Sequence, residues 1–377
     1  MKKKIVSMVL AGCMLVTTAC GKEAQQSSSS GCQNGCTCTD CVCCESMQTQ
    51  SSIISEEVIS EPVSTVQQTE MQTETQQATE QLETETDNST ENQDTSSDEY
   101  ANGIANLTEG EREARKAQQK NFAEARELLY SLSNSKDKTE KINQMDRQIL
   151  ANNAYDFSKS NIVFIGDSIT EGVTAAVDAN GNKVSYTTYA NSQLHFQSLL
   201  NHGVAGRMFS DYGGNELSLS MNFDQVTNMN SDIIVVFAGV NDYLANVDNK
   251  RYGDINNKES TAGYCGSVRY FMKQLKEYYS DNEIFFVTMY KINRTQKCTY
   301  SDITTQPTLN DYLDVQRKLA KEYGFHVIDL YKQGFMDCST QESSDYYLRD
   351  GIHPKDNGNI VLGEHIAAEL SLYFGQK

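Results

Sequence analysis

The chain has 377 residues, of which 22% are charged and 9% aromatic, and its formal net charge is −19. Residues 21–100 hold sixteen acidic residues and one Lys, whereas residues 101–377 hold 28 basic and 35 acidic residues. Neither part has an excess of basic side chains that could neutralise phosphates, so the composition argues against nucleic-acid binding.

The first 20 residues have the pattern of an export signal. Three lysines at positions 2–4 precede an apolar run, residues 5–16, that is too short to span a bilayer as a mature helix. The pattern resembles a bacterial lipoprotein signal peptide, which ends at a lipidated Cys. We expect lipidation at Cys20, because that gives a more usual signal length; Cys13, with the better cleavage box, is the alternative. The resemblance implies a protein anchored by lipid on the extracytoplasmic side of the cell membrane, and ordinary secretion remains open.

Residues 21–106 are predicted to be a disordered tether. Acidic residues, Ser, Thr and Gln dominate residues 45–100, so this stretch buries too little apolar surface to offset its ordering entropy. Six cysteines crowd together before it: Cys32, Cys36, Cys38, Cys41, Cys43 and Cys44. They could bind a soft metal or form disulfides. The cluster contains no His, and Cys43 and Cys44 are adjacent. Both features disfavour an ordinary zinc site and favour local disulfides or free thiols.

Residues 107–157 are predicted to form a helical lead-in that packs on the following domain. Thr108 and Glu111 fit a capping box, in which each side chain satisfies an amide at the start of a helix. Apolar residues then recur at three- and four-residue steps through Leu132. A second helix is predicted over residues 141–151.

Residues 158–377 are predicted to be a single α/β domain. Five apolar runs indicate strands, at residues 161–165, 200–204, 232–238, 283–289 and 325–330. The third run is apolar after its first residue, which is typical of a strand buried on both faces of a parallel sheet. Helical segments alternate with the strands, at residues 261–279, 308–323 and 357–373. The pattern predicts a three-layer α/β/α sandwich with a mostly parallel five-stranded sheet, whose sites form beyond the carboxyl ends of the strands.

A serine at such a strand end is the first candidate for chemistry. Gly166-Asp167-Ser168 follows the first predicted strand directly, and the Gly allows a sharp turn. A serine hydroxyl is a poor nucleophile unless a base removes its proton during attack. Of the five histidines, only His353 has a carboxylate three residues earlier, Asp350. A short turn with that spacing can direct both side chains the same way, so that Asp orients the imidazole and His takes the proton.

Two further strand ends supply candidate donors for a developing oxyanion. Gly206 closes the segment after the second strand, where its amide would have no side chain in the way. Asn241 follows the apolar third strand, and its side-chain amide could donate a hydrogen bond there.

These blocks resemble those of the SGNH hydrolase superfamily, also called GDSL esterases, over about residues 155–375. The resemblance implies a flavodoxin-like fold and ester hydrolysis. It implies that Ser168 is the nucleophile and the first oxyanion amide, completed by Gly206 and Asn241. It also implies that Asp350 orients the imidazole of His353 and that His353 is the base.

The sequence departs from the eponymous motif at Ile169, where the family has Leu; an apolar residue suffices there. Asp329, near the end of the last strand, is expected to be structural. The remaining histidines are interpreted as structural or surface residues: His195, His202, His326 and His365. Cys265, Cys298 and Cys338 are an odd number in the folded part, so at least one is unpaired or pairs outside the domain.

The family includes carbohydrate O-acetyl esterases, lipases or lysophospholipases, and thioesterases. An extracytoplasmic site favours polymer-linked esters, because thioesters are mainly cytoplasmic. The segment 175–192, expected to be a polar loop with Asn180, Tyr186, Tyr189 and Asn191, suits an acylated carbohydrate better than an acyl chain. A non-catalytic surface binding protein is the competing class, against which the intact catalytic set argues. No cofactor or metal is expected, and the oligomeric state is left open.

Overall fold

The structure is a computed structural model that describes residues 103–133, 135–211, 215–245, 251–258, 262–292 and 307–377. The predicted signal peptide, the Cys cluster and Cys298 lie outside these ranges. The helices are α3 (Glu109–Tyr130), α4 (Lys136–Ala151), α5 (Ser168–Glu171), α6 (Tyr186–Leu194), α7 (Val240–Ala245), α8 (Gly263–Tyr278), α9 (Leu309–Tyr323), α10 (Leu330–Gln333), α11 (Gln341–Tyr347) and α12 (Asp356–Gly375). The strands are β1 (Asn161–Gly166), β2 (Ala176–Val177), β3 (Lys183–Val184), β4 (Ser198–Gly203), β5 (Ile233–Phe237), β6 (Glu283–Val287) and β7 (His326–Ile328).

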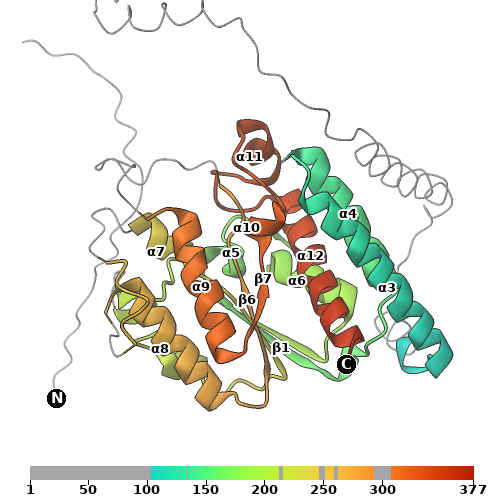
Figure 1. Cartoon of the computed structure of the whole chain (residues 1–377), viewed down its shortest axis with the longest axis horizontal. Coiled ribbons are helices and arrows are strands. Elements are labelled where there is room, and N and C mark those ends of the chain that lie inside the picture. The colour runs from blue at the N-terminus through green and yellow to red at the C-terminus, as the bar shows by residue number, and fades with distance from the viewer. Residues whose placement is uncertain (1–102, 134, 212–214, 246–250, 259–261, 293–306) are drawn as a thin grey trace, which may run out of the picture. The chain divides into compact units, whose positions relative to one another are not determined.

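Five strands form one parallel sheet in the order β4-β1-β5-β6-β7, which confirms the predicted fold class. Figure 1 shows α8 and α9 on one side of the sheet and α6 and α12 on the other. After β4 the chain crosses to the opposite side of β1, so the strand order reverses between β1 and β5. Open α/β sheets form their sites at the carboxyl edge beside such a reversal.

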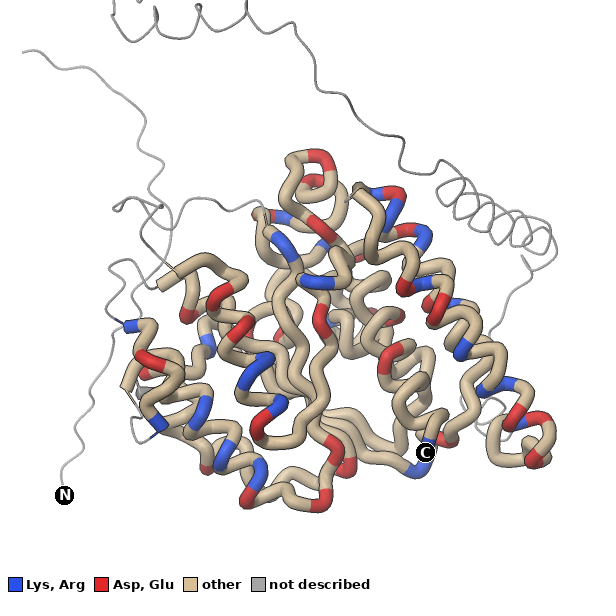
Figure 2. The backbone as a smooth tube through the Cα atoms, in the orientation of Figure 1, with Lys and Arg blue, Asp and Glu red and all other residues tan. Residues whose placement is uncertain are grey.

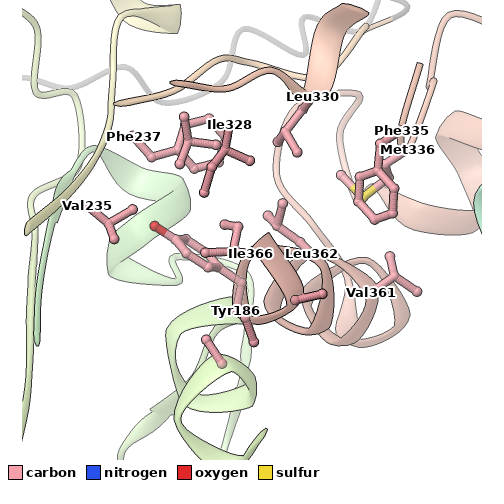
Figure 3. Close-up of a cluster of buried hydrophobic side chains, with 14 of the residues drawn as sticks. Tyr186, Val235, Phe237, Ile328, Leu330, Phe335, Met336, Val361, Leu362 and Ile366 are labelled. Carbon is pink, nitrogen blue, oxygen red and sulfur yellow. The ribbon is translucent and has the colours of Figure 1, made fainter. Parts of the chain in front are cut away.

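Alternate strand residues build the two cores. Ile162 and Phe164 face the layer of α6 and α12, whereas Val163 and Ile165 face the layer of α8 and α9. All four are buried, because parallel strands covered on both faces need apolar residues on both. Figure 3 shows part of the first core, where Val235 and Phe237 of β5 meet Leu362 and Ile366 of α12.

Helix α12 is buried around most of its circumference, so it needs cover on the side away from the sheet. The lead-in supplies it: α3 and α4 pack against each other and on α12. Ile142 and Ile149 of α4 are completely buried. The capping box of Thr108 and Glu111 is present at the start of α3. Packed structure begins slightly before the expected residue 107, since Ile104 is buried.

A buried ionic cluster joins the lead-in to α12. Arg126 of α3 donates through Nη1 to Asp146 Oδ1 (2.5 Å) and through Nη2 to Glu369 Oε1 (2.8 Å). His365 Nδ1 lies 2.8 Å from Asp146 Oδ2, and its ring stacks on Phe335. Removing one partner of such a cluster leaves an uncompensated buried charge, so the lead-in and α12 depend on each other.

The expected polar loop over residues 175–192 is wrong in part. The segment holds a short antiparallel hairpin, β2 and β3, followed by helix α6. Tyr186 points into the core, as Figure 3 shows, where its hydroxyl meets Thr170 Oγ1 at 2.9 Å. Asn191 Oδ1 accepts from the amide of Phe196 at the end of α6. These two side chains serve the fold, and the exposed polar side chains of the segment lie on the hairpin and, at Thr188 and Ser192, on α6.

Basic and acidic residues are interspersed along the described helices, as Figure 2 shows. Within the described ranges, no helix is both long and apolar enough to cross a membrane.

Candidate active site

Three loops leave the sheet side by side at its carboxyl edge. Gly166, the last residue of β1, lies in register with Gly203 of β4 and with Phe237 of β5. The predicted Ser, Gly and Asn of the site each follow one of these residues by a few positions. The sheet register therefore brings the three motif blocks to one place.

The loop after β1 presents the serine. A Cβ at Gly166 would collide with the Thr170 side chain and the Phe237 carbonyl, so only glycine fits this turn. Asp167 caps the one-turn helix α5 by accepting from the amide of Ile169 (3.0 Å). Ser168 is the first residue of that helix and is 8% exposed. Its amide has no intrahelical acceptor and bonds to none of the described residues, so it can donate to a substrate oxygen.

The loop before α12 presents the base. Ser168 Oγ lies 2.8 Å from His353 Nε2, and His353 Nδ1 lies 2.7 Å from Asp350 Oδ2. Nδ1 therefore donates to the carboxylate, which leaves the Nε2 lone pair for the serine proton. The three predicted side chains form one continuous chain of hydrogen bonds.

The turn that carries Asp350 and His353 is fixed by its own backbone. Gly351 has φ +82°, a conformation that favours glycine. The Tyr290 hydroxyl, just beyond β6, donates to the carbonyl of Ile352. Thr174 Oγ1 donates to the carbonyl of Pro354 (2.9 Å), which ties this turn to the loop after α5. Tyr290 was not predicted; its position after a strand end was the available signal.

The Asp350 carboxylate stays ionised over the neutral range. Partial burial acts to raise its pKa, but hydrogen bonds from the side chain and backbone of His353 outweigh it and hold the pKa well below its usual range. Oδ1 accepts from the amides of Ile352 (3.1 Å) and His353 (2.9 Å), which aims Oδ2 at the imidazole.

The loop after β4 is a β-turn that exposes an amide. The amide of Arg207 donates to the carbonyl of Val204 (3.0 Å), and Gly206 has φ +80°. Ala205 has a negative φ, so the turn is of type II, which favours glycine at its third position. The amide of Val204 donates to the carbonyl of Gly166 (3.0 Å), which holds the turn beside the serine loop. Among the described residues, no acceptor is bonded to the amide of Gly206.

Asn241 lies beside the same turn. It is the second residue of α7, and its Nδ2 donates to the carbonyl of Arg207 (3.1 Å). That bond uses one of its two amide hydrogens and fixes the side-chain orientation, so the second remains as a donor. The structure thus groups Ser168, Gly206 and Asn241 by register and hydrogen bonds.

Two buried carboxyls support the site and were not predicted. Asp242 accepts from the amides of Phe209 (2.8 Å) and Ser210 (3.0 Å), which anchors the chain after the turn. Burial raises the pKa of Asp242 to about 6 and that of Asp167 to about 7. Asp167 belongs to the Gly-Asp-Ser motif and Asp242 directly follows Asn241, but the burial of both depends on tertiary packing.

Asp329, Cys265 and Cys338 form none of the hydrogen bonds of this site. Asp329 makes a bidentate ion pair with Arg317, a structural role as expected. Cys265 and Cys338 are free and buried. Within the described ranges, no group of three or more His, Cys, Asp or Glu side chains is placed to hold a metal ion.

Comparison with known proteins identifies the family. The family model described as GDSL-like lipase/acylhydrolase matches residues 164–360, just over half of the chain. A comparison with curated protein sequences found no match.

Solved structures that resemble the chain include a protein from Lactobacillus plantarum, at 20% identity and TM-score 0.47, covering 56% of this chain and 96% of that one. A GDSL-like lipase from Parabacteroides merdae is 19% identical, with TM-score 0.41 and coverage of 57% and 96%. An acetyl xylan esterase is also 19% identical, with TM-score 0.39 and coverage of 56% and 99%. By its family match, the chain belongs to the GDSL-like lipase/acylhydrolase family and is an ester-hydrolysing enzyme.

Proposed function

We propose that the enzyme hydrolyses O-acyl esters, chiefly acetyl groups, on carbohydrates or cell-surface polymers outside the cytoplasm. Ser168 is the nucleophile, His353 the base and Asp350 the orienting carboxylate of the proposed reaction. The observation that carries the assignment is the hydrogen-bond chain from Asp350 through His353 to Ser168.

The reaction follows from this geometry in two halves. Ser168 Oγ attacks the ester carbonyl carbon while His353 Nε2 takes its proton, and the imidazolium then protonates the leaving alcohol. Water attacks the resulting acyl-enzyme with the same base. In both halves the carbonyl oxygen gains negative charge, which the amides of Ser168 and Gly206 and the side chain of Asn241 stabilise.

The preference for a carbohydrate rests on the surroundings of the serine. The hairpin of β2 and β3 follows α5 after residues 172–175 and turns through Asp178, Asn180 and Asn182, all exposed. A hydrated polar substrate matches such an edge. A lipid ester is the second candidate, because Val173 and Val177 of the same segment are 46% and 63% exposed and could contact an acyl chain.

A substrate panel decides between these candidates. The domain without its first 102 residues is assayed with acetylated sugars, short and long nitrophenyl esters, lysophospholipids and an acyl thioester, with the Ser168→Ala protein as the background control. We expect the highest kcat/KM on acetylated sugars and a fall as the acyl chain lengthens. A preference for long-chain or phospholipid esters would replace the carbohydrate assignment with the lipase one.

The proposed anchor is tested separately from the chemistry. Replacing both Cys13 and Cys20 by Ala in the full chain should move the protein from the membrane fraction to the soluble or secreted fraction. Retention of the double variant in membranes would contradict lipid anchoring at these residues.

Replacing Asn241 by Ala should lower kcat by about 10²–10³-fold with little change in KM, the usual effect of removing an oxyanion donor. The loss falls on kcat because the charge that the amide stabilises develops only in the transition state. Steady-state kinetics on a nitrophenyl ester measure both constants. A rise in KM alone would mean that Asn241 binds the ground state and that the oxyanion role is wrong.

The rate should fall in acid as one proton binds, because a protonated His353 cannot accept the Ser168 proton. Asp350 is not the source of this step: its folded-state pKa is lowered, so its ionised form is lost only when the pH falls through that lower value. A profile of kcat/KM from pH 5 to 8 measures the step, and a flat profile would exclude a histidine base.

Asp167 could also produce a fall in rate within this profile, since its pKa of about 7 lies between pH 5 and 8. A variant that cannot titrate at this position is therefore the control. Asp167→Asn keeps an oxygen that can cap α5 but does not titrate. The acid limb should persist in Asp167→Asn. Its disappearance would assign the limb to Asp167 instead.

A further inference from the structure

The carboxylate of Glu171 joins three elements of the site. Glu171 is the last residue of α5, the one-turn helix that begins with Ser168. Its Oε2 accepts from the backbone amide of Ala205 (2.7 Å), and its Oε1 accepts from Lys183 Nζ (2.6 Å) on β3. The serine helix, the turn after β4 and the hairpin therefore meet at one side chain.

The contact with Ala205 completes the hydrogen bonding of the type II turn. The amides of Val204 and Arg207 donate to Gly166 and to Val204, as described above. The amide of Ala205 points away from the turn and finds its acceptor in Glu171. Once these three are bonded, the amide of Gly206 is the one left for a substrate oxygen.

The backbone contact should outweigh the ion pair. The side chains of Glu171 and Lys183 are 32% and 41% exposed, so water screens their attraction, and such pairs contribute at most about 1 kcal/mol. The bond from Ala205 to a carboxylate is charge-assisted and adjoins the amide that must be held in place. We expect the length of the Glu171 side chain to matter most, because it decides whether an acceptor oxygen reaches the amide of Ala205.

We propose that Glu171 is a positioning residue that sets the Gly206 amide relative to Ser168, so that both can bind the same oxyanion. The proposal rests on the proposed oxyanion role of Gly206. It requires a side chain long enough to reach the amide of Ala205, and it assigns Lys183 no part in turnover.

Four variants separate reach from charge. Glu171→Asp keeps the charge but is one methylene too short, whereas Glu171→Gln keeps the length and an acceptor oxygen without the charge. Glu171→Ala removes both, and Lys183→Met removes only the ion pair. The readouts are kcat, KM, the melting temperature and the inhibition constant of a short alkyl boronic acid, which forms a tetrahedral adduct on the serine and so reports on the oxyanion donors.

We expect kcat in the Asp and Ala variants to fall about tenfold, less than the complete loss of an oxyanion donor would cause, because the Gly206 amide is displaced and not removed. Their KM and melting temperature should stay nearly unchanged. Their boronic acid affinity should fall by a similar factor. Glu171→Gln and Lys183→Met should stay within about threefold of the original protein in kcat.

Full activity in Glu171→Asp, or a Gln variant as impaired as the Asp variant, would overturn the positioning role. A loss of kcat in Lys183→Met as large as that in Glu171→Ala would overturn the positioning role and assign the effect to the ion pair. An unaltered protein that neither hydrolyses esters nor binds the boronic acid would instead refute the proposed site itself.

Discussion

Ser168→Ala should lower kcat/KM for any ester substrate by about 10⁴-fold or more, because it removes the atom that attacks the carbonyl. His353→Ala should do nearly as much damage, since the members of a triad act as a unit. Turnover of a nitrophenyl ester measures the loss against the uncatalysed background.

The fold should survive this substitution. The Ser168 hydroxyl is bonded to His353, and its loss leaves the sheet and both cores intact. The melting temperature should therefore stay within a few degrees of that of the unaltered domain. Ser192→Ala is the matched control, because its hydroxyl only bonds back to the carbonyl of Tyr189 on α6. Activity of the Ser168→Ala protein comparable to that of the original would refute the nucleophile assignment.

Deleting the lead-in should abolish folding, whereas deleting the preceding residues should not. Removal of residues 1–157 takes away α3 and α4, including Ile142 and Ile149, both completely buried. Each buried apolar side chain of this size contributes about 1.5–3 kcal/mol. Several such losses, together with Glu369 and His365 of α12 left without Arg126 and Asp146, approach the whole stability of a typical domain, about 5–15 kcal/mol.

The comparison protein begins at residue 103, since Ile104 is buried and its carbonyl accepts from Arg112 Nη2. It should melt cooperatively and show an unchanged kcat on a small soluble ester. Ile149→Ala in this protein gives the graded check, with an expected loss of about 2–5 kcal/mol in the free energy of unfolding. A stable, active fragment 158–377 would show that α12 does not need α3 and α4 packed on it.

Local patterns were enough to predict most of the fold. Neighbouring residues alone identify the apolar runs of β1 and β5 and the capping box at Thr108. The triad was predictable because each member lies in a short block with its own spacing. The sheet register then brings the blocks together.

What the sequence did not predict depends on distant partners. Tyr186 lies in a polar stretch, and its burial follows from a hydroxyl partner on Thr170 and ring contacts with Phe164 and Phe237. The environment of His365 depends on Asp146, a residue 219 positions away. Periodicity and spacing carry no information about such pairs, which is why the expected loop was partly wrong and the buried cluster was not foreseen.

The most direct test of the central claim is covalent labelling by a fluorophosphonate, followed by peptide mass mapping. The reagent reacts with a serine only when a base activates it and oxyanion donors hold the phosphoryl oxygen. We predict a single adduct on the peptide containing Ser168, absent in Ser168→Ala and much slower to form in His353→Ala. No adduct, or one on another serine that persists in Ser168→Ala together with esterase activity, would contradict the account.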